Sequence, residues 1–278
     1  MLNLLYYPVK CCFFPPRAGK IKEEIEMIDQ KTLAYINLYA VLGALENLCE
    51  LAPEASALLT NKKPLSIGFD VKGGPAATIT FYNGQCRMTD GCKKCDVKLP
   101  FGSPEKFNGL IDGTVTPIPT KGYLHIGFLL KDFTKLTDLL NKYMRPSEED
   151  LKDPDFFKIN TTLTLYVVGV AIAQIANQDE IGKFSAAHTA DGSVLIGIDG
   201  GPAVEVRVKD HHFVTLKRRP EKFRAAMSFV DYETANALFN GTVNALTALG
   251  TGKIGMHGLN SMLDNINRIL DRVSIYLA

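Results

Sequence analysis

The sequence predicts an α+β fold built as two sequential copies of a mainly antiparallel sheet covered by helices. The first observation is a repeated tetrapeptide, because Gly73-Gly74-Pro75-Ala76 recurs 127 residues later as Gly200-Gly201-Pro202-Ala203. The second is that the same offset superposes Leu38-Tyr39 on Leu165-Tyr166. The third is a change of apolar spacing within each half, from the helical period to the alternation of a half-buried strand. A period this long indicates domain duplication and not a solenoid, whose repeats span roughly 20 to 50 residues.

The repeat extends to the end of each half. The stretch Asn108 to Val115 falls on Asn236 to Val243 with one inserted residue, and order and spacing are both kept. The charged, proline-bounded stretch from Arg145 to Pro154 is typical of a linker. We therefore expect an apolar N-terminal arm over 1–29, a first domain over 30–146, a linker over 147–156 and a second domain over 157–278.

Each half predicts the same order of elements. An opening helix is followed by three strands, a second helix, a short strand and a closing amphipathic helix. Asn83-Gly84 predicts a tight hairpin between the first two strands, because both residues tolerate positive φ. The expected ranges are 31–59, 77–81, 85–89, 95–101, a helix from 103, 123–128 and 133–143 in the first half, and 158–178, 204–208, 213–216, 223–229, a helix from 231, 254–257 and 262–276 in the second.

Composition is that of a soluble globular chain. Hydrophobic residues make up 46%, charged residues 22%, and the formal net charge is +1, so no nucleic-acid partner is implied. The apolar run from Leu163 to Ala176 is shorter than the roughly 20 residues of a membrane span and predicts a buried helix. The N-terminus lacks the basic start and small-residue cleavage site of a signal peptide. Six clustered cysteines do not suggest a secreted disulfide framework, so a cytoplasmic protein is expected.

The second half contains the motif Leu238-Phe239-Asn240-Gly241, followed by Gly252-Lys253-Ile254 and Gly258. These motifs resemble those of the sterol carrier protein 2 family of lipid-binding domains. In the first half Asp96-Val97-Lys98-Leu99 resembles the third strand of the family, although Arg224 replaces this aspartate in the second half and Lys121-Gly122 reverses the glycine-lysine order. The resemblance implies an apolar tunnel between sheet and helices that holds a lipid, sterol or fatty acyl chain.

The inward positions of the first helices and strands are the candidate ligand-lining residues under this interpretation. They are Leu38, Val41, Leu45, Ile79, Phe81, Cys86, Leu165, Val168, Ile172, Val206, Val208, Phe213, Met227 and Phe229. The alternative for the same residues is a solid core, since protein interiors pack to about 0.75 density with few voids.

Three cysteines suggest a function of a different class. Cys86, Cys92 and Cys95 have spacing that could serve a soft metal or thiol exchange. Zinc prefers four ligands, and the matching positions of the second half include Phe213 and Phe223, which favours Cys86 and Cys95 as small inward hydrophobes. Cys92, beside two lysines in a hairpin, is the most exposed thiol on this interpretation, and Cys11 and Cys12 have no assigned role.

Other polar motifs have plain structural interpretations. His125 and His257 fall on matching predicted strands, where they are either a functional pair or strand-edge residues with a hydrogen bond. His211-His212 fits a solvated turn. The basic stretch Lys217 to Arg224 is either a solvated edge or a contact with an anionic membrane surface. The aromatic N-terminal arm is expected to dock on the body, to cover a tunnel mouth or to rest on a membrane.

The sequence therefore predicts a non-enzymatic protein that binds or transfers lipids, with an apolar small molecule as partner and with no cofactor, metal or catalytic residue. A redox or metal-binding protein that uses the three cysteines is one alternative. A structural or dimerisation module without ligand is the other.

Overall fold

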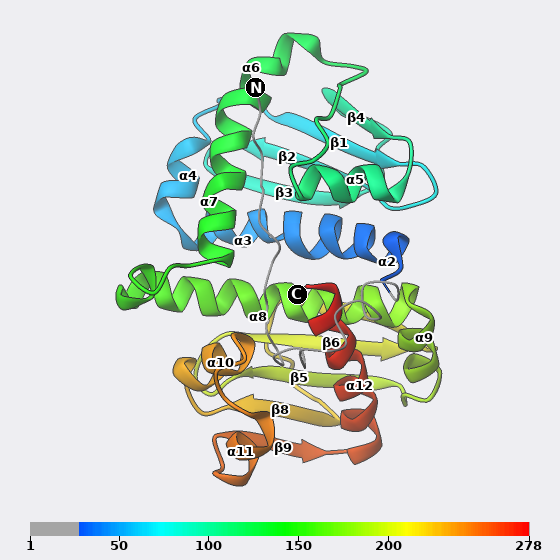
Figure 1. The fold of residues 1–278 in the computed structure, drawn as a ribbon, viewed down its shortest axis with the longest axis vertical. Helices are drawn as coiled ribbons and strands as arrows, with labels where there is room; N and C mark the ends of the chain where they lie inside the picture. The colour runs from blue at the N-terminus through cyan, green and yellow to red at the C-terminus, as the bar shows by residue number, and fades with distance from the viewer. Residues whose placement is uncertain (1–27, 278) are drawn as a thin grey trace. The chain divides into compact units, whose positions relative to one another are not determined.

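The computed structural model describes residues 28–277, which fold into two compact units (Figure 1). The first unit contains residues 33–159, and the second contains 28–32 together with 160–277. Helices α2 (Gln30–Tyr35) and α8 (Pro154–Gln178) each cross the boundary. The predicted N-terminal arm, with Cys11 and Cys12, lies outside the described residues apart from its last two positions.

The opening helix of the first unit is confirmed but is interrupted. It consists of α2, the π-helical segment η1 (Ile36–Leu42), α3 (Ala44–Leu51) and α4 (Pro53–Leu58). The wide turn ends at Gly43, whose amide donates to the carbonyl of Leu38. A side chain there would clash with the carbonyl oxygen of Tyr39, which explains a glycine inside the helix. The break before α4 falls at Pro53, because proline cannot donate the next helical hydrogen bond.

The sheet of the first unit contains a strand that the predicted pattern omitted. β1 (Leu65–Val71), β2 (Ala76–Tyr82), β3 (Gln85–Asp90) and β4 (Val97–Phe101) lie in the order β3-β2-β1-β4. The three-strand succession expected from the sequence is therefore wrong, because β4 pairs in parallel with β1 and is not a neighbour of β3. The other pairs are antiparallel, as predicted.

The predicted hairpin at Asn83-Gly84 is confirmed. Asn83 has φ 47° and Gly84 has φ 81°, the two positive values that a two-residue hairpin turn requires. The second unit makes the same turn with non-glycine residues, Asp210 at φ 50° and His211 at φ 63°.

The short strand predicted over 123–128 is wrong. This stretch forms a 3-10 turn η2 (Tyr123–His125), then α6 (Ile126–Phe128) and the π-helical η3 (Leu129–Phe133), which leads into the closing helix α7 (Thr134–Met144). Helical spacing places Phe128 and Phe133 together over the sheet, where their rings lie 5.3 Å and 5.9 Å from that of Phe81. Both rings are half-buried in this position. Among the described residues, the bridge between Lys98 and Lys121 is the part of the expected strand pairing that forms.

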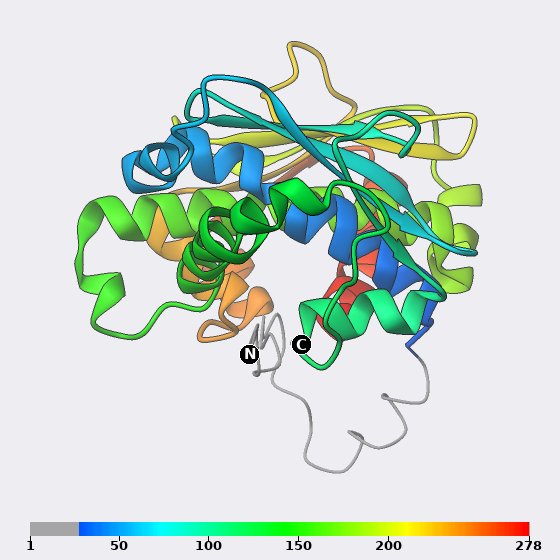
Figure 2. The same cartoon turned by 90° about the horizontal axis from the view of Figure 1, so that it is seen from above.

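Two further helical segments complete the first unit. α5 (Pro104–Ile111) follows β4 and starts at the predicted Ser103-Pro104, although no side-chain cap forms there. The predicted linker contains the short turn η4 (Asp150–Lys152). Figure 2 shows the helices of this unit gathered on one face of its sheet.

The second unit repeats the order of the first. Helices α8 and α9 (Glu180–Ala187) precede β5 (Gly192–Ile198), β6 (Ala203–Lys209), β7 (His212–Leu216) and β8 (Ala225–Phe229). α10 (Tyr232–Phe239), α11 (Ala245–Gly250), β9 (Ile254–Gly258) and α12 (Asn260–Tyr276) follow. Here the predicted short strand does form, as edge strand β9 of the order β7-β6-β5-β8-β9.

The two sheets agree in pairing as well as in order. Leu65 faces Phe81 across β1 and β2, and Gly192 faces Val208 across β5 and β6, each partner 127 positions later. β5 and β8 are parallel, like β1 and β4. Both units are thus mixed α+β structures whose sheets have one face covered by helices, and the matched registers allow residue-by-residue comparison of the two interiors.

Candidate functional site between sheet and helices

The interior of the first unit is filled by aromatic rings. Phe69 on β1 and Phe81 on β2 are fully buried on the face of the sheet that the helices cover. The ring of Phe69 lies 6.3 Å from that of Phe107 on α5 and 6.4 Å from that of Phe133. Together with the contacts of Phe81 described above, the rings of sheet and helices interlock across the centre of the unit. Side chains of this chain therefore pack against one another between the sheet and the helices of this unit.

The second unit has smaller side chains at the two central positions of the sheet. The matched registers place Ile196 where the first unit has Phe69, and Val208 where it has Phe81. The segment that corresponds to the helical turn of Phe128 is β9, which extends the edge of the sheet and does not cover its face. One substitution goes the other way, because Phe213 stands where the first unit has Cys86. Among the described residues, the second unit thus has no counterpart of the cluster around Phe69 and Phe81, although the rings of Phe229 and Phe239 pack 5.6 Å apart in it.

The residues expected to line a ligand belong to these two layers. All are buried except Val41, which is half-buried. The buried ones are Leu38, Leu45, Ile79, Phe81, Cys86, Leu165, Val168, Ile172, Val206, Val208, Phe213, Met227 and Phe229.

A buried asparagine links the middle helix to the opening helix in each unit. Asn108 on α5 accepts a hydrogen bond of 3.1 Å from Asn37. Asn236, at the matching place on α10, donates to Asn160 at 2.7 Å and to Thr161 at 2.9 Å. The pairs satisfy polar groups that would otherwise be costly to bury. The sequence repeat contained the signal, since both asparagines begin the motif shared by the two halves.

The three cysteines of the alternative function do not come together. Cys86 is buried on β3 with its sulfur 3.9 Å from that of Cys49 on α3. Cys92 and Cys95 form a separate pair with a sulfur–sulfur distance of 3.7 Å. Within residues 28–277 no group of three or more histidine, cysteine or acidic side chains is arranged to hold a metal ion. Cys86 and Cys95 are buried as expected, and Cys92 is half-buried, which makes it the most accessible of the cysteines that the structure describes.

The two matching histidines have different surroundings. His257 lies on β9, whereas His125 ends the turn η2, so the prediction of matching strands is wrong for His125. Both side chains are exposed, and His211 and His212 are exposed at the β6–β7 hairpin as predicted.

The basic stretch from Lys217 to Arg224 forms the loop between β7 and β8. Arg218 pairs with the buried Glu205 at 3.0 Å, and Arg219 and Arg224 donate to the carbonyls of Ile198 and Asp191. Three of its arginines therefore fasten the loop to the sheet edge.

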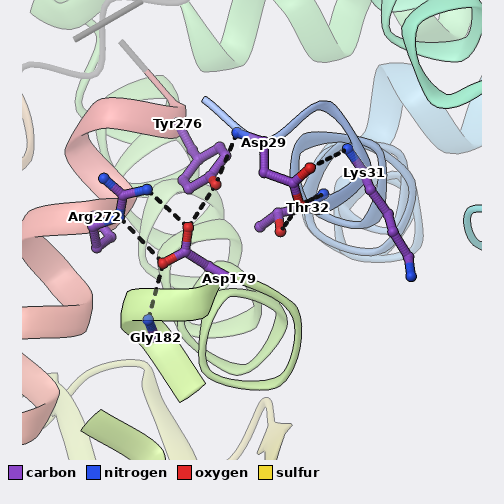
Figure 3. Close-up of polar contacts among 7 residues, drawn as sticks. All are labelled: Asp29, Lys31, Thr32, Asp179, Gly182, Arg272 and Tyr276. Carbon is purple, nitrogen blue, oxygen red and sulfur yellow. Dashed lines mark hydrogen bonds and ion pairs between the residues drawn. The ribbon is translucent and has the colours of Figure 1, made fainter. Parts of the chain in front are cut away.

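A buried polar cluster of the second unit joins its closing helix to the corner between α8 and α9 (Figure 3). Asp179 accepts hydrogen bonds from the amide of Gly182 at 2.9 Å, from Arg272 at 2.8 Å and from the hydroxyl of Tyr276 at 2.7 Å. The amide of Asp29 in turn donates to the oxygen of Tyr276. One carboxylate thus caps α9 and holds α12.

These contacts set the charge state of Asp179. Burial alone would raise its pKa, but the hydrogen bonds of Arg272, Tyr276 and Gly182 and the charge of Arg272 keep the pKa below its ordinary value of 3.8. Burial and the neighbouring carboxylate raise the pKa of Tyr276 to about 12. Asp179 is therefore ionised and fully engaged, which is the behaviour of a structural clamp.

One described helix is long and apolar enough to cross a membrane. It is α8, and 78% of its most apolar window is buried inside the protein. The core helix of a soluble protein passes the same test. The sequence prediction of a buried helix agrees with this burial.

No family model and no curated protein matches the chain. Among solved structures, sterol carrier protein 2 from Yarrowia lipolytica, in its apo form, is similar at 14% identity with a TM-score of 0.29, over 37% of this chain and 92% of that one. A conserved hypothetical protein from Thermus thermophilus, described as a candidate sterol carrier protein, is similar at 16% identity with a TM-score of 0.27, over 44% of this chain and 92% of that one.

Replacement of Asp179 by alanine is expected to destabilise the second unit by about 3 to 5 kcal/mol, because Arg272 would keep a buried charge without its carboxylate. Urea unfolding followed by circular dichroism measures this loss. The matched control is Asp70→Ala, which removes the partner of Lys98 from a solvent-exposed ion pair and should cost far less, because water screens such pairs. Equal losses for the two variants would contradict the clamp.

The contribution of Asp179 is expected to depend on pH in the acid range. Because its pKa is lowered by folding, the contribution is complete above the unfolded pKa near 3.8 and is lost as pH falls through the folded pKa. The difference in unfolding free energy between the natural chain and Asp179→Asn should be constant from neutral pH to about 5 and should shrink below it. A difference that grows on acidification would contradict this sign.

Proposed function

We propose that the chain is a lipid-binding or lipid-transfer protein that holds an apolar ligand between the sheet and helices of its second unit. The observation that carries this proposal is the contrast between the two interiors. The first is filled by the rings of Phe69, Phe81, Phe128 and Phe133, and the second has Ile196 and Val208 at the two matched sheet positions. Protein interiors are close-packed, so we infer that an apolar ligand takes the volume that the two smaller side chains leave at these positions.

The lining has the chemistry of such a site. Val168 and Ile172 on α8 and Val206 and Met227 on the sheet are buried and carry no charge. A lipid, sterol or fatty acyl chain would be held there by burial of its apolar surface, at roughly 25 cal/mol per Å². The activity proposed is binding, without a catalytic step or a cofactor.

The sequence motifs and the repeated topology support two copies of a sterol carrier protein 2-like domain. The domains proposed are 30–146 and 157–278, joined by the linker 147–156, and they have diverged so that the two do not share one role. We place the protein in the cytoplasm, with transient contact to membrane surfaces during exchange. The basic loop Lys217 to Arg224 is the proposed contact, because anionic lipids attract such clusters.

The proposal predicts opposite effects of exchanging residues between the two interiors. Val208→Phe and Ile196→Phe place the rings of the first unit in the second and should weaken binding of a fluorescent fatty acid about tenfold or more, a loss of roughly 1.4 kcal/mol or more. Fluorescence titration of the full chain measures the dissociation constant. Phe81→Val, the reverse exchange in the first unit, is the matched control and should not weaken binding.

Overpacking by itself can cost about 1 to 3 kcal/mol of stability, so urea unfolding of each variant accompanies the titration. Undiminished binding by folded Val208→Phe and Ile196→Phe would place the ligand elsewhere. Absence of binding by the natural chain to fatty acids, sterols and phospholipids would reject the proposed function.

A further inference from the structure

Cys92 and Cys95 lie on the face of the first sheet that the helices do not cover. They belong to the loop between β3 and β4, in the sequence Cys92-Lys93-Lys94-Cys95. Both sulfurs sit over Gly68 on the central strand β1, whose neighbours Ile67 and Phe69 point to the opposite, helix-covered face. The pair is thus separate from the apolar interior.

Gly68 provides the space for the two thiols. A Cβ atom at this position would lie 2.2 Å from the sulfur of Cys92 and 2.7 Å from that of Cys95, so any other residue would displace them. The matched register places Leu195 at the corresponding position of the second unit, where it packs with Ala203 and Ala226. One copy covers this part of its sheet with a leucine side chain, and the other has a glycine and two thiols.

The loop is anchored on the side of Cys95 and accessible on the side of Cys92. Asp96 holds the amide and hydroxyl of Ser66 at 2.8 Å and 2.6 Å, and Lys121 donates to the carbonyl of Cys95. Cys95 is buried, whereas Cys92 is half-buried. The sulfurs are 3.7 Å apart and need to approach to about 2.05 Å to form a bond, a shift within reach of side-chain rotation in a loop.

We infer that Cys92 and Cys95 form a reversible disulfide by exchange with an external disulfide, such as oxidised glutathione or the disulfide of a redox protein. The accessible Cys92 thiolate attacks the external disulfide, which gives a mixed disulfide and releases one thiolate. The thiolate of Cys95 then attacks the sulfur of Cys92 and releases the second. The protein loses two electrons and two protons, and the external disulfide becomes two thiols.

The thiolate of Cys92 is scarce at neutral pH. Burial, Cys95 and Asp70 raise the pKa of Cys92 to about 11, and the charge of Lys98 acts in the opposite direction. Exchange is therefore slow, since the thiolate is the attacking form. Such a pair is suited to slow equilibration with the surrounding thiols and disulfides and not to rapid reaction with peroxide.

The second pair of neighbouring cysteines serves as an internal control. Cys49 and Cys86 lie 3.9 Å apart but are both buried between helix and sheet, where an external disulfide has no access. This pair is expected to stay reduced while the protein is folded.

The test is equilibration of the full chain with glutathione buffers of graded redox potential, followed by alkylation of free thiols and peptide mass spectrometry. The peptide that contains Cys92 and Cys95 should become lighter by two hydrogen atoms in oxidising buffer and should return on reduction. Cys95→Ser should accumulate glutathione on Cys92, because no resolving thiol remains. Gly68→Ala should shift the transition toward more oxidising buffers by displacing the sulfurs.

Three outcomes would overturn the inference. They are alkylation of both cysteines in the most oxidising buffer, stable glutathione on Cys92 of the natural chain, and oxidation of Cys49 and Cys86 before this pair. Circular dichroism of Gly68→Ala separates an effect on the thiols from loss of the fold. None of these measurements involves lipid, so their result is independent of the proposed function.

Discussion

Both units depend on one constraint, which is that the apolar face of a sheet must be covered by helices. The central strands β1 and β5 create this demand, because each pairs with a neighbour on both sides and carries large buried residues of its sheet. Their parallel partners, β4 and β8, follow the antiparallel strands in the sequence and pair on the other side of the central strand. The helices that come after β4 and β8 then lie on the covered face of the sheet. The closing helices α7 and α12 are part of this helical layer, and the buried asparagines Asn108 and Asn236 bond its helices to one another. The clamp at Asp179 is the polar fastening of the same layer in the second unit.

The two units meet the constraint in different ways. In the first, sheet and helices supply rings that pack against one another, and a helical turn replaces the edge strand so that Phe128 reaches the sheet. In the second unit this segment is the edge strand β9, and the central positions of the sheet carry aliphatic side chains. The outer faces diverge as well, with thiols over Gly68 in one copy and Leu195 in the other. Units that share a topology but differ at their interiors need not share a function, and the proposals for the two units differ accordingly.

Much of the fold could be predicted from apolar spacing, and the exceptions have physical reasons. Opening and closing helices, the Asn83-Gly84 turn and the burial of the inward residues follow from local pattern. β1 also has strict alternation, Leu65, Ile67, Phe69 and Val71, which is a strand pattern that the sequence shows, whereas β5 is apolar almost throughout and is buried at consecutive positions. Parallel pairing of β1 with β4 joins strands that are far apart in the sequence, and no local sequence pattern predicts it. The short strand predicted in both halves forms only as β9 in the described part of the chain, because the segment of His125 is helical. Proximity of Cys86 to Cys49 depends on the packing of α3 against β3, and that of Cys92 to Cys95 depends on their loop and on Gly68; neither contact could be predicted from the sequence.

The central claim is that an apolar molecule occupies the second unit, and it is tested most directly by native mass spectrometry of the purified full chain with analysis of its organic extract. The account predicts a mass above that of the chain by one lipid, sterol or fatty acid, which the extract identifies and which is lost from Val208→Phe but kept in Phe81→Val. A chain that carries no such molecule, and that takes up none when supplied with each class, would contradict it.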